Sequence, residues 1–269
     1  MSKRSRGYAP FACSEFQDDL LTRAAEQVGT GSVAIFDLDG CLFDTRFRQV
    51  AIFKEFAAAH GVLELFHIKV SHFQDWDLRN TLMRLELSED RIEEIYPALR
   101  EFWWTRFFSN TYVRMDHAMP GAVELVRACY EQGAYVVYLT GRDNTMRKGT
   151  EDSLLAFGFP YQTSNTLLMT KPEFSMDDTQ YKEAALKEIR QLGTPKLFVD
   201  NEPSNCNRFV HCCPDALVLF FETDHSPRPD VPHSDLYWLR SFFRREWHGE
   251  QWKEYEELPL VVREQCERT

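Results

Sequence analysis

The sequence predicts an α/β fold, a doubly wound, Rossmann-like parallel sheet into which a helical domain is inserted. Three observations predict it: short apolar runs, helical patterns between these runs, and one long segment that lacks strands. Apolar runs of this length are typical of strands that a parallel sheet buries on both faces. They lie at residues 32–36, 134–139, 196–199 and 216–221, with a weaker candidate at 166–169.

Helical patterns alternate with these runs along the chain. One helix is expected between Gly121 and Gly133, and another over about 178–192, where apolar residues recur at helical spacing. A third is expected to begin at Thr150, a favourable N-cap residue, and to end before Gly158. Because strands and helices alternate, successive strands are expected to lie parallel in one sheet.

Residues 45–115 interrupt this alternation. They contain no convincing strand but at least two helical patterns, one over 46–60 and one that carries Ile92, Ile95 and Leu99. The segment is too long for an ordinary loop, so we expect an inserted helical domain here. The core domain would then comprise residues 32–44 and 116–225.

The two ends of the chain fall outside the core pattern. Residues 1–31 form a polar lead-in with one predicted helix, Glu15–Val28. Residues 226–269 form a C-terminal extension, rich in proline and charge at its start, with a helix expected over Asp235–His248. The sequence assigns no role to this extension.

Composition limits the classes of partner. The 269 residues include 31 Lys and Arg against 42 Asp and Glu, a net charge of −11 that repels a nucleic-acid backbone and excludes general coating of DNA or RNA. No apolar run approaches the roughly 18 residues of a membrane helix, so no membrane partner is expected. The 7 cysteines are scattered through apolar patterns, which suits free thiols in a reducing cytoplasm. The oligomeric state stays open.

Two carboxylates follow the first predicted strand. Asp37 and Asp39 stand one residue apart at its carboxyl end, the edge at which open α/β sheets bind ligands. Side chains at this spacing face the same side of an extended chain, so both can face one pocket. One carboxylate can act as a nucleophile and become phosphorylated. Its neighbour can protonate the leaving oxygen and later deprotonate a water molecule.

The residues from Asp37 onward read DLDGCLFD, which resembles motif I of the haloacid dehalogenase (HAD) superfamily, D-x-D-G-T/V-L-x-D. Cys41 stands where threonine or valine is usual, a mild departure because that side chain does not react. The resemblance extends to motif II, a hydroxyl residue at the end of the second core strand. Thr140 fills this position and is implied to bind the phosphoryl group, followed by Gly141 and Arg142 as further phosphate or substrate contacts.

Motif III of the superfamily is a lysine near the start of the helix before the next core strand. Lys182 is the preferred candidate, because a cation early in a helix is easier to understand if it meets a phosphate. Its context also resembles the phosphatase domain of polynucleotide kinase-phosphatases. Lys171, in a Lys-Pro context that other branches use, is the alternative.

Motif IV is an acidic cluster after that strand, and Asp200 is its main candidate. The resemblance implies a Mg²⁺ site formed by Asp37, Asp39 (through a nearby main-chain carbonyl) and Asp200. The family commonly has a second aspartate here, whereas this chain has Asn201 and then Glu202, which could act through a metal-bound water. An all-oxygen site of this kind suits Mg²⁺.

By position and helical content, residues 45–115 resemble a cap of the C1 type, which sets substrate selectivity in the family. Within it Trp76 and Arg79 are candidate substrate contacts, although packing and surface charge explain them more simply. The sequence as a whole predicts a Mg²⁺-dependent phosphatase that hydrolyses a small phosphomonoester through an aspartyl-phosphate on Asp37. The alternatives are a phosphotransferase or phosphomutase, a nucleic-acid 3′-phosphatase, and a catalytically weak HAD-like scaffold. The natural substrate stays open.

Overall fold

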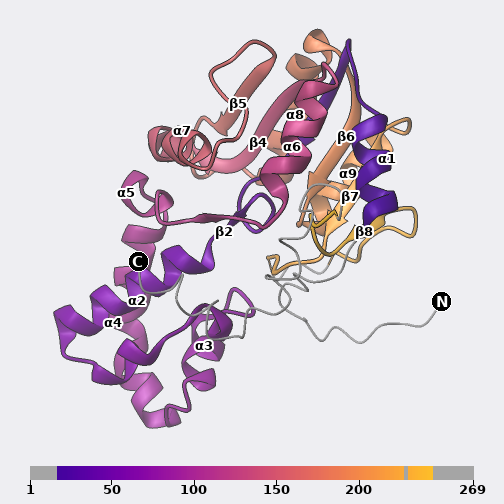
Figure 1. Ribbon diagram of the computed structural model, residues 1–269. Coiled ribbons are helices and arrows are strands. Elements are labelled where there is room, and N and C mark those ends of the chain that lie inside the picture. Colours follow the sequence, from indigo (N-terminus) through magenta and orange to yellow (C-terminus); the bar gives the residue numbers. More distant parts are fainter. Residues whose placement is uncertain (1–16, 227–229, 245–269) are drawn as a thin grey trace.

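The computed structural model describes residues 17–226 and 230–244. Within them a parallel sheet carries helices on both faces, and a group of helices extends from one end of it (Figure 1). This confirms the predicted doubly wound α/β fold. The strand order is β5-β4-β1-β6-β7-β8. The strands are β1 (Ser32–Phe36), β4 (Tyr135–Asp143), β5 (Thr166–Lys171), β6 (Thr194–Asp200), β7 (Leu217–Phe221) and β8 (Tyr237–Leu239).

Side chains of the central strand alternate between two hydrophobic layers. Ala34 and Phe36 of β1 pack into one cluster, and Val33 and Ile35 pack into the other. All five residues of β1 are buried, because helices cover both faces of the sheet. The first cluster involves α1 (Asp18–Glu26), α6 (Ala122–Glu131) and α7 (Arg147–Ala156), and the second involves α8 (Asp178–Leu192) and α9 (Pro203–Cys212).

Two sequence predictions fail near the ends of elements. Helix α7 begins at Arg147, before the predicted N-cap Thr150, because Asp143 caps a 3₁₀ turn (Asn144–Met146) that leads directly into the helix. The helix predicted over Asp235–His248 is wrong for its described part, where Tyr237–Leu239 pairs with β7 as an edge strand; residues 245–248 lie outside the described residues.

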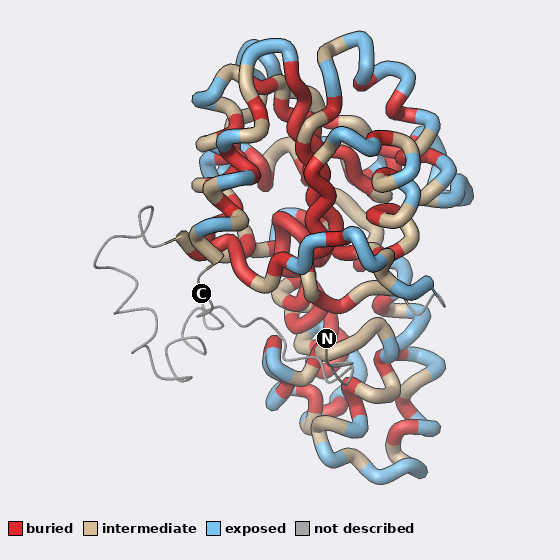
Figure 2. The backbone as a smooth tube through the Cα atoms, turned by 90° about the vertical axis from the view of Figure 1, so that its right-hand side faces the viewer, coloured by how far each residue is buried: buried red, intermediate tan, exposed pale blue. Residues whose placement is uncertain are grey.

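The helices of residues 46–113, between β1 and α6, have a hydrophobic core of their own. Phe53 and Phe56 of the first helix pack with Leu82 and Leu99 of later helices, in a cluster separate from those of the sheet. Figure 2 shows this second group of buried residues below the main core. The helices are α2 (Arg46–His60), α3 (Leu78–Arg84), α4 (Glu89–Phe107) and α5 (Asn110–Val113), with 3₁₀ helices at Leu63–His67 and Val70–His72. We refer to residues 46–113 as the insert.

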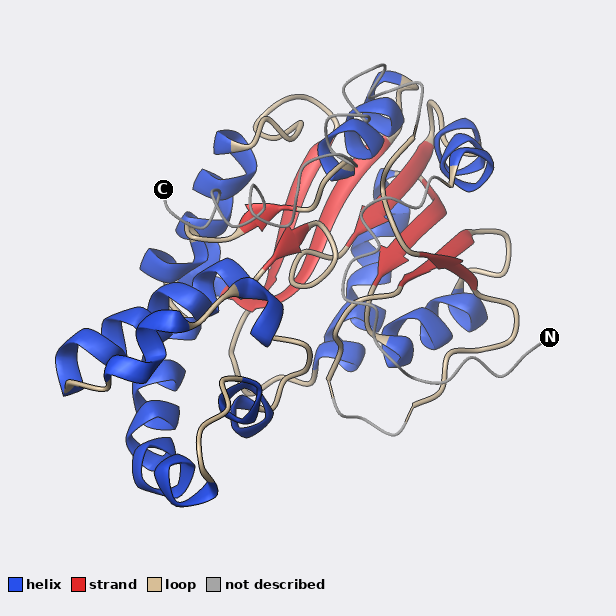
Figure 3. Cartoon of the chain, turned by 60° about the horizontal axis from the view of Figure 1, so that its bottom comes forward, coloured by secondary structure: helices blue, strands red, loops and turns tan. Residues whose placement is uncertain are grey.

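The chain enters and leaves the insert at one place. Strand β2 (Phe43–Asp44) pairs antiparallel with β3 (His117–Ala118), so the two connections run side by side. The insert therefore lies beyond one end of the parallel sheet, as Figure 3 shows. No helix in the described ranges combines the length and the apolar character needed to cross a bilayer.

Candidate active site

Three strands bring predicted site residues to one edge of the sheet. Asp37 directly follows β1, and its backbone N–H donates to the Val199 carbonyl of β6 (2.9 Å). Asp200 ends β6. The strand order reverses at β1, which lies between β4 and β6, and ligands bind at such switch points in open α/β sheets. Asp37 and Asp200 line a cavity of about 400 Å³ at this edge, together with Gly141 and Lys182.

The predicted motif II hydroxyl lies behind the cavity surface. Thr140 is fully buried within β4, and its Oγ1 accepts a hydrogen bond from the Arg142 N–H (3.2 Å). Gly141 does line the cavity. A Cβ at Gly141 would lie 2.7 Å from Asp178 Oδ2, so the missing side chain lets the start of α8 approach β4 closely.

Lys182 connects two of the three predicted acidic residues. Its Nζ donates to Asp37 Oδ1 (2.5 Å) and to Asp200 Oδ2 (2.7 Å). Helix α8 begins at Asp178, where the Asp177 carboxylate accepts from the Gln180 N–H. Lys182 lies one turn later and is almost completely buried.

The alternative lysine has a different environment. Lys171 Nζ pairs with Asp178 Oδ1 (2.6 Å) and donates to the carbonyls of Phe174 (3.1 Å) and Met176 (2.9 Å). It therefore fixes the loop between β5 and α8 at the side of the cavity. Of the two lysine candidates, the structure brings Lys182 to Asp37.

Asp37, Asp200 and Lys182 together carry one more negative than positive charge when all three are ionised. Burial and the nearby charge of Asp200 raise the pKa of Asp37 to about 8, against the opposing effect of Lys182. Burial also opposes the charge of Lys182, but Asp200 and Asp37 outweigh it and raise the pKa of that lysine. Two carboxylates thus share one cation, and the floor of the cavity favours a further positive charge or a proton.

The donor chemistry here fits Mg²⁺, which prefers oxygen ligands. Asp200 is held rigidly, since its Oδ1 accepts from the Glu202 N–H (2.8 Å) and its Oδ2 from Asn205 Nδ2 (3.0 Å). Asn201 is oriented by its Nδ2, which donates to the Asp224 carbonyl (2.6 Å). In the described part of the chain no three His, Cys, Asp or Glu side chains are gathered as metal ligands. Lys182 bridges Asp37 and Asp200 instead.

Glu202 and Gly40 shape the surroundings of this site. The Glu202 carboxylate accepts from the N–H (3.0 Å) and hydroxyl (2.9 Å) of Ser226, which ties the segment after β7 to the cavity. Gly40 has a φ of +72°, and a Cβ there would collide with the Asn201 carboxamide. The turn after Asp39 therefore requires glycine.

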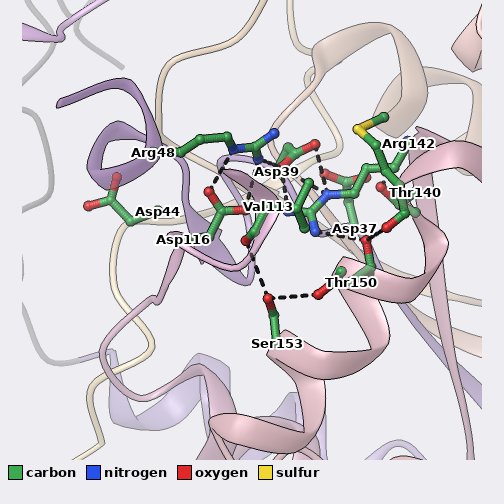
Figure 4. A network of polar contacts seen from close by, with 12 residues as sticks. Asp37, Asp39, Asp44, Arg48, Val113, Asp116, Thr140, Arg142, Thr150 and Ser153 are labelled. Carbon is green, nitrogen blue, oxygen red and sulfur yellow. Dashed lines mark hydrogen bonds and ion pairs between the residues drawn. The ribbon is translucent and has the colours of Figure 1, made fainter. Parts of the chain in front are cut away.

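Asp39 belongs to a separate cluster of four charged side chains, shown in Figure 4. Its Oδ1 accepts from Arg142 Nη2 (2.6 Å) and from Arg48 Nη2 (2.8 Å). Both arginines also donate to Asp116 Oδ2, at 2.7 and 2.8 Å. Arg48, Arg142 and Asp116 are buried, so their charges are compensated within the cluster rather than by solvent.

This cluster fixes the protonation of Asp39. Burial favours its neutral form, but Arg142 and then Arg48 outweigh that effect and hold the pKa of Asp39 well below its usual value. In this arrangement Asp39 is a carboxylate that can accept a proton, as a general base does. To donate a proton it would first have to move away from the two arginines.

Arg142 was predicted as a phosphate or substrate contact, and it does line the cavity. Its guanidinium nevertheless has partners in the protein, since Nη1 donates to Thr150 Oγ1 (3.0 Å) while Nε and Nη2 contact Asp39. The structure thus places it beside the general acid-base candidate, with no nitrogen free of a partner.

Sequence reasoning missed Arg48 and Asp116. The sequence does hold a signal for Arg48. It stands four residues before Ile52 and eight before Phe56, on the same face of α2, and all three are buried. An arginine on the apolar stripe of a helix requires a buried partner. Nothing local identifies that partner, because Asp116 follows 68 residues later.

Known proteins resemble this chain in fold and, over part of its length, in sequence. A model of the family described as HAD superfamily, subfamily IIIB (Acid phosphatase), matches residues 99–195. That range includes Thr140 and Lys182. No curated protein matches the chain.

Solved structures are similar to this chain at low identity. A Clostridium difficile protein provisionally assigned as a phosphatase is 11% identical, with a TM-score of 0.50 over 78% of this chain and 93% of that chain. Protein Tyrosine Kinase A of Mycobacterium tuberculosis is 19% identical, with a TM-score of 0.47 over 83% and 98%. A HAD-superfamily hydrolase of subfamily IA from Geobacter sulfurreducens is 16% identical, with a TM-score of 0.47 over 80% and 93%.

Proposed function

We propose that this chain, a phosphatase of the HAD superfamily, hydrolyses small phosphomonoesters through a covalent phosphoenzyme on Asp37. The contact of Lys182 Nζ with both Asp37 and Asp200 carries the proposal. It puts a candidate nucleophile on the floor of a cavity, beside an ammonium that can neutralise an incoming phosphoryl group. Asp39 lies two residues away and lines the same cavity.

The proposed reaction has two steps. An Asp37 carboxylate oxygen attacks phosphorus and the bond from phosphorus to the ester oxygen breaks. The leaving alcohol takes up a proton that Asp39 first accepts from solvent and then donates, once its carboxyl group has moved away from Arg48 and Arg142. Asp39 then takes a proton from water, whose oxygen attacks phosphorus and breaks its bond to Asp37. Inorganic phosphate and the free enzyme result. Lys182 compensates phosphoryl charge throughout.

Mg²⁺ is proposed as the cofactor. Asp37 and Asp200 would hold it, with the main-chain carbonyl of Asp39, and Asn201 would contribute through water. When bound, the ion neutralises the phosphoryl oxygens that these carboxylates would otherwise repel. Two carboxylates pair with a single ammonium, and among the described residues no other cationic side chain forms an ion pair with either, which supports this assignment.

The test is phosphate release from p-nitrophenyl phosphate with Mg²⁺, with and without EDTA. Wild type and the surface control Asp235→Asn should be active, and Asp37→Asn should be inactive while keeping its fold by circular dichroism. Acid-quenched enzyme should carry one phosphoryl group that Asp37→Asn lacks. Added alcohols test the phosphotransferase alternative, because a transferase would pass the phosphoryl group to them. An end-labelled 3′-phosphorylated oligonucleotide tests the nucleic-acid alternative.

The proposal would be refuted by a wild-type protein that hydrolyses none of these phosphate esters and is not stabilised by beryllofluoride with Mg²⁺.

A further inference from the structure

We propose that the cavity above Asp37 selects phosphomonoesters whose organic group is a planar aromatic ring, held between the insert and a loop of the core. This inference rests on the proposed phosphatase function and specifies its substrate class. The contrast between the charged floor of the cavity and its apolar walls is the observation that suggests it.

The walls come from two separate parts of the chain. Trp76, Phe107 and Phe108 line the cavity from the insert, and Phe174 and Met176 line it from the loop between β5 and α8. A phosphoryl group on the floor would therefore place its ester substituent among aromatic and thioether side chains. Ring stacking and sulfur–ring contacts are the favourable interactions that such walls offer.

The core side of this wall is held in place before any ligand arrives. Phe174 is 42% exposed and Met176 is 40% exposed, which is costly for large apolar side chains unless something covers them. Lys171 Nζ donates to the backbone carbonyls of both residues, at 3.1 and 2.9 Å, and pairs with Asp178. A buried ammonium thus fixes a loop that presents apolar side chains to the cavity.

The two sides of the wall already meet through aromatic contacts. The Phe174 ring lies 4.8 Å from Phe108 at 72° and 5.6 Å from Trp104 at 80°, both edge-to-face arrangements. Phe108 in turn packs edge-to-face against Phe107 at 5.0 Å. A planar ring can join such a series in offset or edge-to-face geometry. Hydroxyl groups directed at these aromatic side chains would lack partners, because the polar lining residues Glu202, His225 and Ser226 belong to the segments after β6 and β7.

A second hollow, of about 600 Å³, adjoins the first and gives room for larger rings. The two share Trp76, His225 and Ser226 as lining residues, and the second continues past Tyr96 and Trp103. Trp76 therefore stands at the junction, where it can contact both a single ring and the proximal part of a fused one. Trp76 from the insert and Phe174 from the core loop are therefore the two residues whose removal tests the inference.

The kinetic test compares benzyl phosphate with cyclohexylmethyl phosphate, which have leaving alcohols of similar acidity and differ in the ring. Wild type should favour the benzyl ester in kcat/KM by about fivefold, the size of an aromatic contact beyond simple burial. Trp76→Leu and Phe174→Leu should each bring this ratio toward one. The matched controls Trp238→Leu and Phe66→Leu, at exposed positions outside the cavity, should keep it.

Ethyl phosphate, a phosphomonoester that has no ring, separates failure of the inference from failure of the proposed function. If wild type hydrolyses ethyl phosphate but treats the two ring esters alike, the aromatic selectivity is refuted and the phosphatase function stands. If the benzyl preference survives in both cavity variants, the assignment of these walls is refuted.

Binding of the uncleavable phosphonates provides a readout that needs no turnover. Isothermal titration with Mg²⁺ should show benzylphosphonate binding about fivefold more tightly than cyclohexylmethylphosphonate, and Trp76→Leu should remove the difference. Equal affinities, or no binding of either phosphonate, would overturn the inference even if no substrate is hydrolysed.

Discussion

Arg48 Nη2 lies 2.8 Å from Asp39 Oδ1 and thereby joins the first helix of the insert to the residue beside the candidate nucleophile. The same arginine donates through Nη1 to the Phe107 carbonyl at the end of α4 (2.7 Å). Its guanidinium also lies over the Phe107 ring, 4.2 Å from the centroid. A displacement of the insert relative to the sheet would therefore have to break contacts that hold Asp39.

The Arg48 cluster should contribute strongly to stability. Arg48→Met leaves Asp39 and Asp116 with only Arg142, and breaking a buried ion pair in this way costs about 3–5 kcal/mol. Arg48→Lys should recover part of this loss. Chemical denaturation followed by circular dichroism measures it. Arg91→Met, which removes an exposed pair with Glu64, is the control and should have a much smaller effect. Equal effects of Arg48→Met and Arg91→Met would contradict the assignment.

The two candidate lysines should differ in their effect on catalysis. Lys182→Met removes the ammonium that contacts Asp37 and Asp200, so kcat/KM should fall about 10²–10³-fold, as when a donor to developing charge is lost. Lys171→Met should mainly affect the loop that carries Phe174, with a smaller loss that appears in KM. Steady-state kinetics with p-nitrophenyl phosphate is the measurement. A larger loss of kcat/KM in Lys171→Met than in Lys182→Met would assign the phosphoryl contact to Lys171 instead.

Metal binding should distinguish the acidic residues after β6. Mg²⁺ should raise the melting temperature of the wild type by an amount that grows with the logarithm of its concentration above the dissociation constant, and Asp200→Asn should abolish this shift. Glu202→Gln should keep most of it, because the Glu202 carboxylate is already bonded to Ser226. Thermal unfolding over a Mg²⁺ titration is the measurement. If Glu202→Gln lost the Mg²⁺-dependent rise in melting temperature while Asp200→Asn kept it, the assignment of the metal site to Asp200 would be contradicted.

Stability without metal should depend on pH through Asp37. Burial and Asp200 raise its pKa to about 8 in the folded protein, against about 4 in the unfolded chain. Between these values the folded state binds a proton that the unfolded state has released, so stability from this group falls as pH rises through the window. In EDTA, Asp37→Asn should therefore become more stable relative to wild type as the pH rises from 5 to 8 (assay values spanning most of the window). Parallel curves would show that Asp37 is not perturbed.

The inner strands are predictable from sequence because burial on both faces leaves a continuous apolar run. Strand β1 is the clearest case, with five buried residues in succession. Strand β8 is not predictable in this way, because it has three residues and lies at the sheet edge, where Tyr237 and Trp238 are exposed. Its pairing with β7 depends on tertiary contacts that no local pattern records.

Local preference also failed where a tertiary contact competes with it. Thr150 is a favourable N-cap residue, yet it lies inside α7, where its hydroxyl donates to the Met146 carbonyl (2.9 Å) and accepts from Arg142. The floor of the site was easier to predict, because Asp37 directly follows β1, Asp200 ends β6, and parallel strands end at one edge. The proximity of Arg48 to Asp39 could not be predicted, since it depends on how the insert sits against the sheet.

The pairing of Asp44 with His117 has a consequence for how such a protein can change over time. Because the two ends of the insert are neighbours, a short turn could connect them directly, and the strands of the sheet would keep their register. Insertions, exchanges or losses at this point would keep Asp37, Lys182 and Asp200 at the edge of the sheet, but they would also remove Arg48 and its contacts with Asp39 and Asp116. A new insert could therefore replace the cavity residues Trp76, Phe107 and Phe108 only if it also provided a partner for Asp39 in place of Arg48.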